Sequence, residues 1–257
     1  MIPLKDDNPI ERFPFMTLGI IAVNALVYIY QLTLPALPLE ALIFRYGAIP
    51  YNLTHPLAKD LLYVTALPPV ITVFTSMFLH GGFIHLASNM LYLWIFGDNI
   101  ENALGHIRFV LFYLVAGLFA ALFHILSDPN ATIPMIGASG AIAGILGAYL
   151  ILFPRTNVST LFIFIIIIRI IKVPAVLILG FWFLIQLLNA GTEGGSVAWY
   201  AHIGGFITGI FLVKILKPAP VSNYRNYRLT GLIIPTYFFF SETDPISTFL
   251  NWSIRIW

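Results

Sequence analysis

A serine and a histidine, each among small residues in an apolar stretch, are the residues of this chain whose types and surroundings suggest chemistry. Ser139 lies in the segment GASGAI at residues 137–142, and His202 lies in the segment AHIGG at residues 201–205. A serine hydroxyl is a weak nucleophile until a neighbouring base takes its proton, and histidine is the most frequent base. The two residues therefore predict nucleophilic catalysis, with Ser139 as the nucleophile and His202 as the base.

Two further polar residues are candidates for the same site. His85 and Asn89 are four residues apart, so they share one face of a helix, and both can donate hydrogen bonds from their side chains. Attack on a carbonyl creates an oxyanion that needs such donors, and the backbone N–H of Ser139 at a helix N-terminus is a third. Each side chain alone is equally consistent with a hydrogen bond that only holds two membrane helices together.

The elements that position these residues must be membrane helices. Of the 257 residues, 59% are hydrophobic and 9% are charged, against about 25% charged in a soluble domain. The mean hydropathy is +0.90. Such a chain cannot bury its apolar surface in one soluble core, so it is predicted to be a polytopic membrane protein in a lipid bilayer. The net charge of +2 is too small to argue for nucleic acid, so no nucleic-acid partner is expected. The absence of cysteine excludes thiolate metal sites.

Six stretches are apolar and long enough to be transmembrane helices. They cover residues 15–34, 84–104, 109–126, 137–153, 173–188 and 198–216. The sequence therefore predicts an all-α fold with a cytosolic N-terminal segment over 1–14, a six-helix domain over 15–216 and an interfacial or poorly ordered tail over 217–257. The stretch 160–171 is ambiguous, because it either starts the fifth helix early or lies along the membrane interface.

Loop charges predict the orientation of these helices. With the N-terminus inside, eleven Lys and Arg residues lie in inner segments, and only Arg45 and Lys59 lie in outer ones. The positive-inside rule then places the N-terminus in the cytoplasm. We expect the membrane to be the plasma (inner) membrane. Helices two, four and six run from outside to inside, so His85, Ser139 and His202 lie at one depth and the site opens to the outer face.

Two faces of small residues at helical spacing accompany the predicted pair. They comprise Ser139, Gly140, Ala143, Gly144 and Gly147 on helix four, and His202, Gly205 and Gly209 on helix six. Such faces let membrane helices approach closely, and the approach would bring the hydroxyl to the imidazole. The nearest acid in sequence, Glu193, belongs to the preceding loop, so a Ser–His dyad is favoured over a triad.

Three motifs together resemble those of the rhomboid family of intramembrane serine proteases, over about residues 75–216. They are GxSGxxxG at Gly137, Ser139, Gly140 and Gly144, AHxxGxxxG at Ala201, His202, Gly205 and Gly209, and HxxxN at His85 and Asn89. The resemblance implies a six-helix bundle of rhomboid type that cleaves single-pass transmembrane proteins in or near the membrane segment. It implies no metal or nucleotide cofactor, and it leaves the oligomeric state open.

The resemblance also implies roles for individual residues. Ser139 attacks the peptide bond, His202 acts as general base and then acid, and His85, Asn89 and the Ser139 N–H stabilise the oxyanion. Some relatives place a tyrosine that stacks on the catalytic histidine one turn after the nucleophile, where this chain has Ala143. Since Trp199 is predicted to point elsewhere on its helix, the support for the His202 ring is left open.

Other classes of function compete with the protease. An inactive relative that binds membrane clients would lack the serine or the histidine, and both are present. A metal site of His80, His85 and His202 would lack carboxylate partners and the HExxH spacing of zinc proteases. A transporter would show an inverted repeat and paired broken helices, and no such repeat is evident.

Glu101 is predicted to be structural and to anchor loop backbone at the inner face.

Overall fold

A computed structural model of the chain describes residues 2–55, 67–164, 167–190 and 198–216. All of them belong to one structural unit, Met1–Ala219. The predicted C-terminal tail over 217–257 lies outside the described residues.

Helices lie over each of the six predicted ranges. They are α1 (Phe15–Thr33), α5 with η1 and α6 (Phe83–Tyr92, Leu93–Gly97 and Asp98–Leu104), α7 (His106–Ser127), α8 (Ser139–Leu152), α9 (Ala175–Asn189) and α10 (Trp199–Leu216). Among the described residues, α1, α7 and α10 are long and apolar enough to cross a membrane, and α8 and α9 are apolar but shorter. Between α1 and α5 lie the short helices α2 (Ala36–Tyr46), α3 (Pro50–Thr54) and α4 (Pro69–Ser76).

The described residues are mostly helical, as predicted, but a three-stranded antiparallel sheet shows that the fold is not all-α. β2 (Asn157–Phe164) and β3 (Ile167–Pro174) form a hairpin over the ambiguous stretch, and β1 (Ile2–Asp6) joins β2 from the N-terminal segment. The stretch therefore does not start the fifth helix early. Its many isoleucines are β-branched and favour strands, but a short apolar run gives the same hydropathy signal in a strand as in a buried helix.

A buried polar cluster fastens β1 to the C-terminal end of α8. The Tyr149 hydroxyl donates to Asp6 Oδ2 at 2.5 Å, and Asn8 Nδ2 donates to the Tyr149 oxygen at 2.9 Å. Burial raises the pKa of Asp6, whereas hydrogen bonds from Tyr149 and Asn8 lower it. The N-terminal segment is thus held on the same helix that carries Ser139 at its other end.

Glu101 of α6 caps the start of α1. Its carboxylate accepts hydrogen bonds from the backbone N–H groups of Met16 at 2.9 Å and Thr17 at 2.7 Å, and from the Thr17 hydroxyl at 2.7 Å. The first turn of a helix has N–H groups without intrahelical partners, and residue 14 is a proline that offers no side-chain cap. Glu101 therefore has the structural role predicted for it, at the beginning of a helix.

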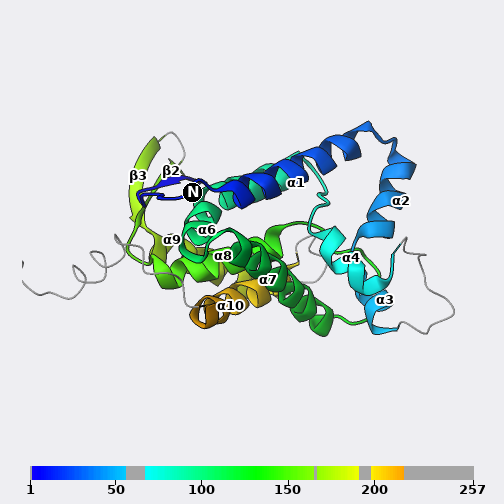
Figure 1. Ribbon diagram of the computed structural model, residues 1–257. Coiled ribbons are helices and arrows are strands. Elements are labelled where there is room, and N and C mark those ends of the chain that lie inside the picture. Colours follow the sequence, from blue (N-terminus) through cyan, green and yellow to red (C-terminus); the bar gives the residue numbers. More distant parts are fainter. Residues whose placement is uncertain (1, 56–66, 165–166, 191–197, 217–257) are drawn as a thin grey trace, which may run out of the picture. The chain divides into compact units, whose positions relative to one another are not determined.

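The helices α7, α8 and α10 pack against one another at small residues (Figure 1). A Cβ on Gly205 of α10 would collide with the carbonyl oxygen of Gly140, and one on Gly209 with the carbonyl oxygen of Gly144. On the α7 side, a Cβ on Gly140 would lie 2.7 Å from the Cβ of Ala120. The predicted small-residue faces of helices four and six are confirmed as the contact between them.

The contact at Gly209 leads to a prediction about stability. Gly209→Ala is expected to lower the free energy of unfolding by about 1–3 kcal/mol, because the new methyl group meets backbone that has no room to shift. The measurement is thermal unfolding of the purified protein in detergent. Gly180→Ala on α9 is the control, since a Cβ there meets nothing within 4 Å among the described residues. Its stability should stay unchanged or rise by about 0.5–1 kcal/mol, and equal melting of the two variants would contradict the prediction.

Candidate active site

The structure brings the predicted nucleophile and base into contact. Ser139 is the first residue of α8, and His202 lies in the first turn of α10. Ser139 Oγ is 2.8 Å from His202 Nε2, a normal hydrogen-bond distance. The contact follows from the close packing of α8 and α10 at glycines, which places the two N-terminal ends side by side.

The other two predicted residues lie over Gly137, two positions before Ser139. The Gly137 φ of +118° lies in the region that favours glycine. A Cβ there would lie 2.7 Å from His85 Nε2 and 3.8 Å from Asn89 Nδ2. Asn89 is 7% exposed, and its Nδ2 has no hydrogen-bond partner among the described residues. The Asn89 amide is therefore a buried donor beside Gly137 that no described group satisfies, and such a donor is costly.

Gln31 of α1, which belongs to none of the sequence motifs, holds the loop before α5. Its Nε2 donates to the His80 carbonyl at 2.9 Å, and its Oε1 accepts from the His80 N–H at 3.1 Å. The buried His80 ring lies edge-on to His85, with centroids 5.0 Å apart. Burial, and then the neighbouring His85, lower the pKa of His80 to about 4. His80 is therefore neutral near pH 7 and packs against a predicted oxyanion donor.

Two side chains of α9 support the His202 ring. Gln186 Oε1 lies 2.7 Å from His202 Nδ1, and the Trp182 ring is tilted by 34° to the imidazole with centroids 5.8 Å apart. Trp199 also contacts the ring edge-on at 6.2 Å, so the prediction that it points elsewhere was wrong. The ring contacts that Ala143 cannot provide thus come from α9 and from the start of α10.

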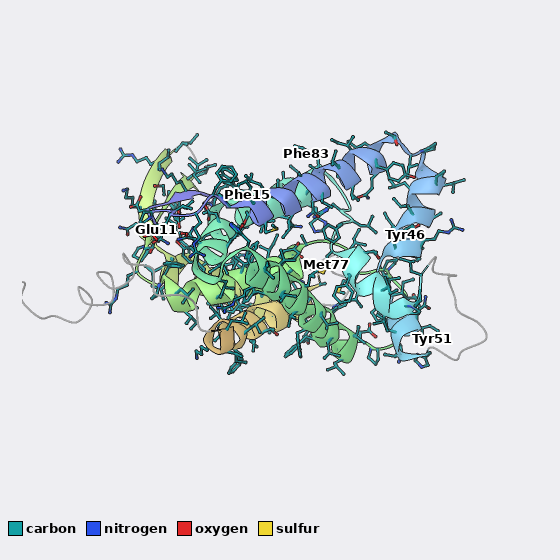
Figure 2. The ribbon with its side chains drawn as sticks, viewed as in Figure 1. Glu11, Phe15, Tyr46, Tyr51, Met77 and Phe83 are labelled. Atoms are coloured by element: carbon teal, nitrogen blue, oxygen red, sulfur yellow. The ribbon has the colours of Figure 1, made fainter. Side chains whose placement is uncertain are left out.

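An apolar cavity adjoins Ser139. Glycines and alanines form more than half of its lining: Gly117, Ala120, Ala121, Gly137, Gly140, Ala141, Ala198 and Ala201. Met77, which follows α4 (Figure 2), also lines it. Ser76 accepts a hydrogen bond from the Gly137 N–H at 2.9 Å through its carbonyl, which ties the loop before Ser139 to the cavity wall.

The geometry does not favour a metal site at these histidines. Both ring nitrogens of His202 already lie within hydrogen-bond distance of Ser139 and Gln186. Within the part of the chain that the structure describes, no three His, Cys, Asp or Glu side chains are arranged to hold a metal ion.

Comparisons with known proteins match this region. The family model of the Rhomboid domain matches residues 68–219, a range that contains all four predicted site residues. The chain is 34% identical over 157 residues to RHOMBOID-like protein 6, mitochondrial, of Arabidopsis thaliana. This match covers 60% of this chain and 46% of that protein. It is also 34% identical over 179 residues to Rhomboid protein 1, mitochondrial, of Saccharomyces cerevisiae. This second match covers 67% of this chain and 48% of that protein.

A bacterial relative is also similar. The chain is 38% identical over 167 residues to Rhomboid protease GluP of Bacillus subtilis, which covers 62% of this chain and 29% of that protein. The chain thus spans about half the length of the two mitochondrial relatives and less of the bacterial one.

Proposed function

Because the chain belongs to the rhomboid family, we propose that it is an intramembrane serine endopeptidase that cleaves single-pass transmembrane proteins in or near the membrane segment. The observation that carries the proposal is the 2.8 Å contact between Ser139 Oγ and His202 Nε2, next to a buried amide donor that lacks an acceptor among the described residues. That one relative is named a protease supports the same conclusion.

In the proposed reaction, Ser139 and His202 act as a dyad. As Ser139 Oγ attacks the carbonyl carbon of the scissile peptide, its proton moves to His202 Nε2. The imidazolium then gives this proton to the leaving amine, the C–N bond breaks, and the carbonyl stays on Ser139 as an ester. Water attacks the ester with His202 again as base, which releases the acid and restores the serine. The protein enters and leaves the cycle unchanged, and the proposed mechanism uses no cofactor.

Three donors stabilise the oxyanion in this proposal. Asn89 Nδ2 and the His85 ring lie over Gly137, and the Ser139 N–H is at the start of α8, where backbone N–H groups lack intrahelical partners. Such preorganised donors are effective because they need no rearrangement when charge develops. The apolar cavity beside Ser139 would then receive a small uncharged side chain next to the cleaved bond.

The proposal includes a six-helix transmembrane bundle and an orientation. We propose that the N-terminus is cytoplasmic and that the site opens to the outer face, and the distribution of Lys and Arg supports this orientation. We also propose that the membrane is the plasma membrane. Relatives that are mitochondrial by name give the plasma membrane no support. Because the chain has no cysteine, single cysteines at exposed positions such as Asn130 and Lys172 test the orientation. An impermeant maleimide should label N130C and not K172C in intact cells, and the reverse result would overturn it.

The deciding experiment is cleavage of a model single-pass protein by the purified chain in liposomes. Mass spectrometry should find one cut in or near the membrane segment, and a fluorophosphonate probe should label Ser139. Binding of the single-pass protein without cleavage or labelling would favour the alternative of a catalytically inactive relative that binds membrane clients. Cleavage that is lost only on chelation would overturn the serine mechanism.

A substitution of Asn89 distinguishes a catalytic role of this residue from a role in helix packing. Asn89→Ala is expected to lower kcat by about 100- to 1000-fold with little change in KM, because the oxyanion forms only in the transition state. Melting in detergent should stay within about 1 °C of wild type, since the Nδ2 group satisfies no acceptor among the described residues. Ser88→Ala, at the exposed neighbouring position, is the control and should keep full activity. A lower melting temperature with unchanged kcat would show that Asn89 only holds the bundle.

A further inference from the structure

A line of three hydrogen-bonded groups runs from α9 to the nucleophile. Gln186 Nε2 donates to the Trp182 carbonyl at 2.8 Å, Gln186 Oε1 lies 2.7 Å from His202 Nδ1, and His202 Nε2 lies 2.8 Å from Ser139 Oγ. Gln186 is 4% exposed. Polar side chains in apolar membrane helices are costly unless they are paired, so its position needs an explanation that helix stability does not supply.

The first hydrogen bond determines the sense of the other two. A carbonyl only accepts, so the Gln186 group that faces Trp182 must be the amide NH₂. The Gln186 oxygen is then left for His202, and it can only accept, so the hydrogen of the neutral imidazole lies on Nδ1. His202 Nε2 is therefore without a proton and accepts from the Ser139 hydroxyl. This is the tautomer that a general base needs.

We propose that Gln186 is the positioning residue of this site, which holds His202 in the Nδ1–H tautomer and aims Nε2 at Ser139. The inference rests on the proposed function for its consequence in catalysis, but the tautomer itself is a property of the free protein. Gln186 acts through His202 and does not touch the substrate. The dyad of Ser139 and His202 thereby gains a third, uncharged member from α9.

An amide differs from a carboxylate in what it does for the imidazolium. The Gln186 amide keeps its hydrogen bond to Nδ1–H when the His202 ring is protonated, but the amide adds no negative charge. The ring is faced by Ser139 from α8 and by Gln186 and Trp182 from α9. Among the residues that the structure describes, His85 on α5 and His124 on α7 are the titratable groups that interact electrostatically with it. Since neither is an acid, a glutamate at position 186 would place a carboxylate directly on Nδ1.

The test compares Gln186→Ala and Gln186→Glu with wild type in the liposome cleavage assay. Gln186→Ala should lower kcat by about a hundredfold with KM within about twofold, as expected when a reacting group is misplaced. Gln186→Glu should recover most of kcat and move the acidic limb of the pH–rate profile to higher pH, because the carboxylate favours the imidazolium. Asn189→Ala is the matched control, because Asn189 makes the same kind of hydrogen bond, to the Ile185 carbonyl four residues before it. It should keep wild-type kcat.

A second measurement does not depend on activity. Nitrogen-15 NMR of histidine-labelled protein, with the His202 signals assigned from a His202→Ala sample, should show Nδ1–H in wild type and a shift toward Nε2–H in Gln186→Ala. Unchanged signals, or equal kcat for Gln186→Ala and Asn189→Ala, would overturn the role of Gln186. If wild type shows the expected tautomer and the Gln186→Ala shift but cleaves no substrate, the proposed function fails and the positioning role stands.

Discussion

Ser139→Ala is expected to reduce cleavage of a single-pass membrane protein by about 10⁵-fold or more. Removal of a nucleophile costs this much because the remaining groups act only together with it. The variant loses one hydroxyl at the start of α8. Among the described residues, the hydrogen-bond partner of this hydroxyl is His202 Nε2, so the fold should stay intact. His202→Ala should lose a similar factor, and the double variant should be no worse than either single one.

The matched control for this prediction is Ser76→Ala. Ser76 lines the same cavity, but its hydroxyl donates to the Val73 carbonyl at 2.8 Å, and its contact to Gly137 is made by its backbone. Ser76→Ala should retain cleavage within about tenfold and should still be labelled by a fluorophosphonate, whereas Ser139→Ala should not be labelled. Cleavage that persists in Ser139→Ala, with unchanged melting in detergent, would rule out the mechanism.

The contact between Ser139 and His202 could be predicted from the sequence because two simple patterns agree on it. Loop charges put the starts of helices four and six at one depth, and glycines such as Gly140 and Gly205 let those helices touch. The hairpin of β2 and β3 could not be predicted in the same way. Its apolar run reads alike in a strand and in a buried helix, and its pairing with β1 joins residues about 155 positions apart, such as Asp6 and Val158.

Support for the site came from residues that carry no motif. Gln186 and Trp182 act through contact with α10, and Gln31 acts through the backbone of His80, so their roles depend on which helix faces meet. One signal was available in the sequence: Gln31 and Gln186 are amides in largely apolar helices, where unpaired polar groups are costly. That rule predicts that such residues have hydrogen-bond partners, but only the packing of the helices shows which groups the partners are.

Glu101→Ala is expected to destabilise the protein by about 3–5 kcal/mol, the largest structural effect among these predictions. Glu101 is 1% exposed and accepts from three donors at the start of α1 and, at 2.5 Å, from His106 Nδ1. Alanine would remove the acceptor from the part-buried N–H of Met16 and from the buried N–H and hydroxyl of Thr17. It would also remove a negative charge from the positive end of the α1 dipole. Each loss acts on the native state alone, because water satisfies these groups when α1 is released.

The measurement is the midpoint of SDS-induced or thermal unfolding in mixed micelles. Glu40→Ala on α2 is the control, since Glu40 is exposed and such changes stay within about 0.5 kcal/mol. Glu101→Gln should fall between wild type and Glu101→Ala, because its single carbonyl oxygen can satisfy only part of the donors while its NH₂ faces others. A midpoint for Glu101→Ala equal to that of Glu40→Ala would show that the start of α1 needs no cap from α6. If the midpoints instead fall in the order Glu40→Ala, Glu101→Gln and Glu101→Ala, from most to least stable, charge and hydrogen bonding together anchor α1.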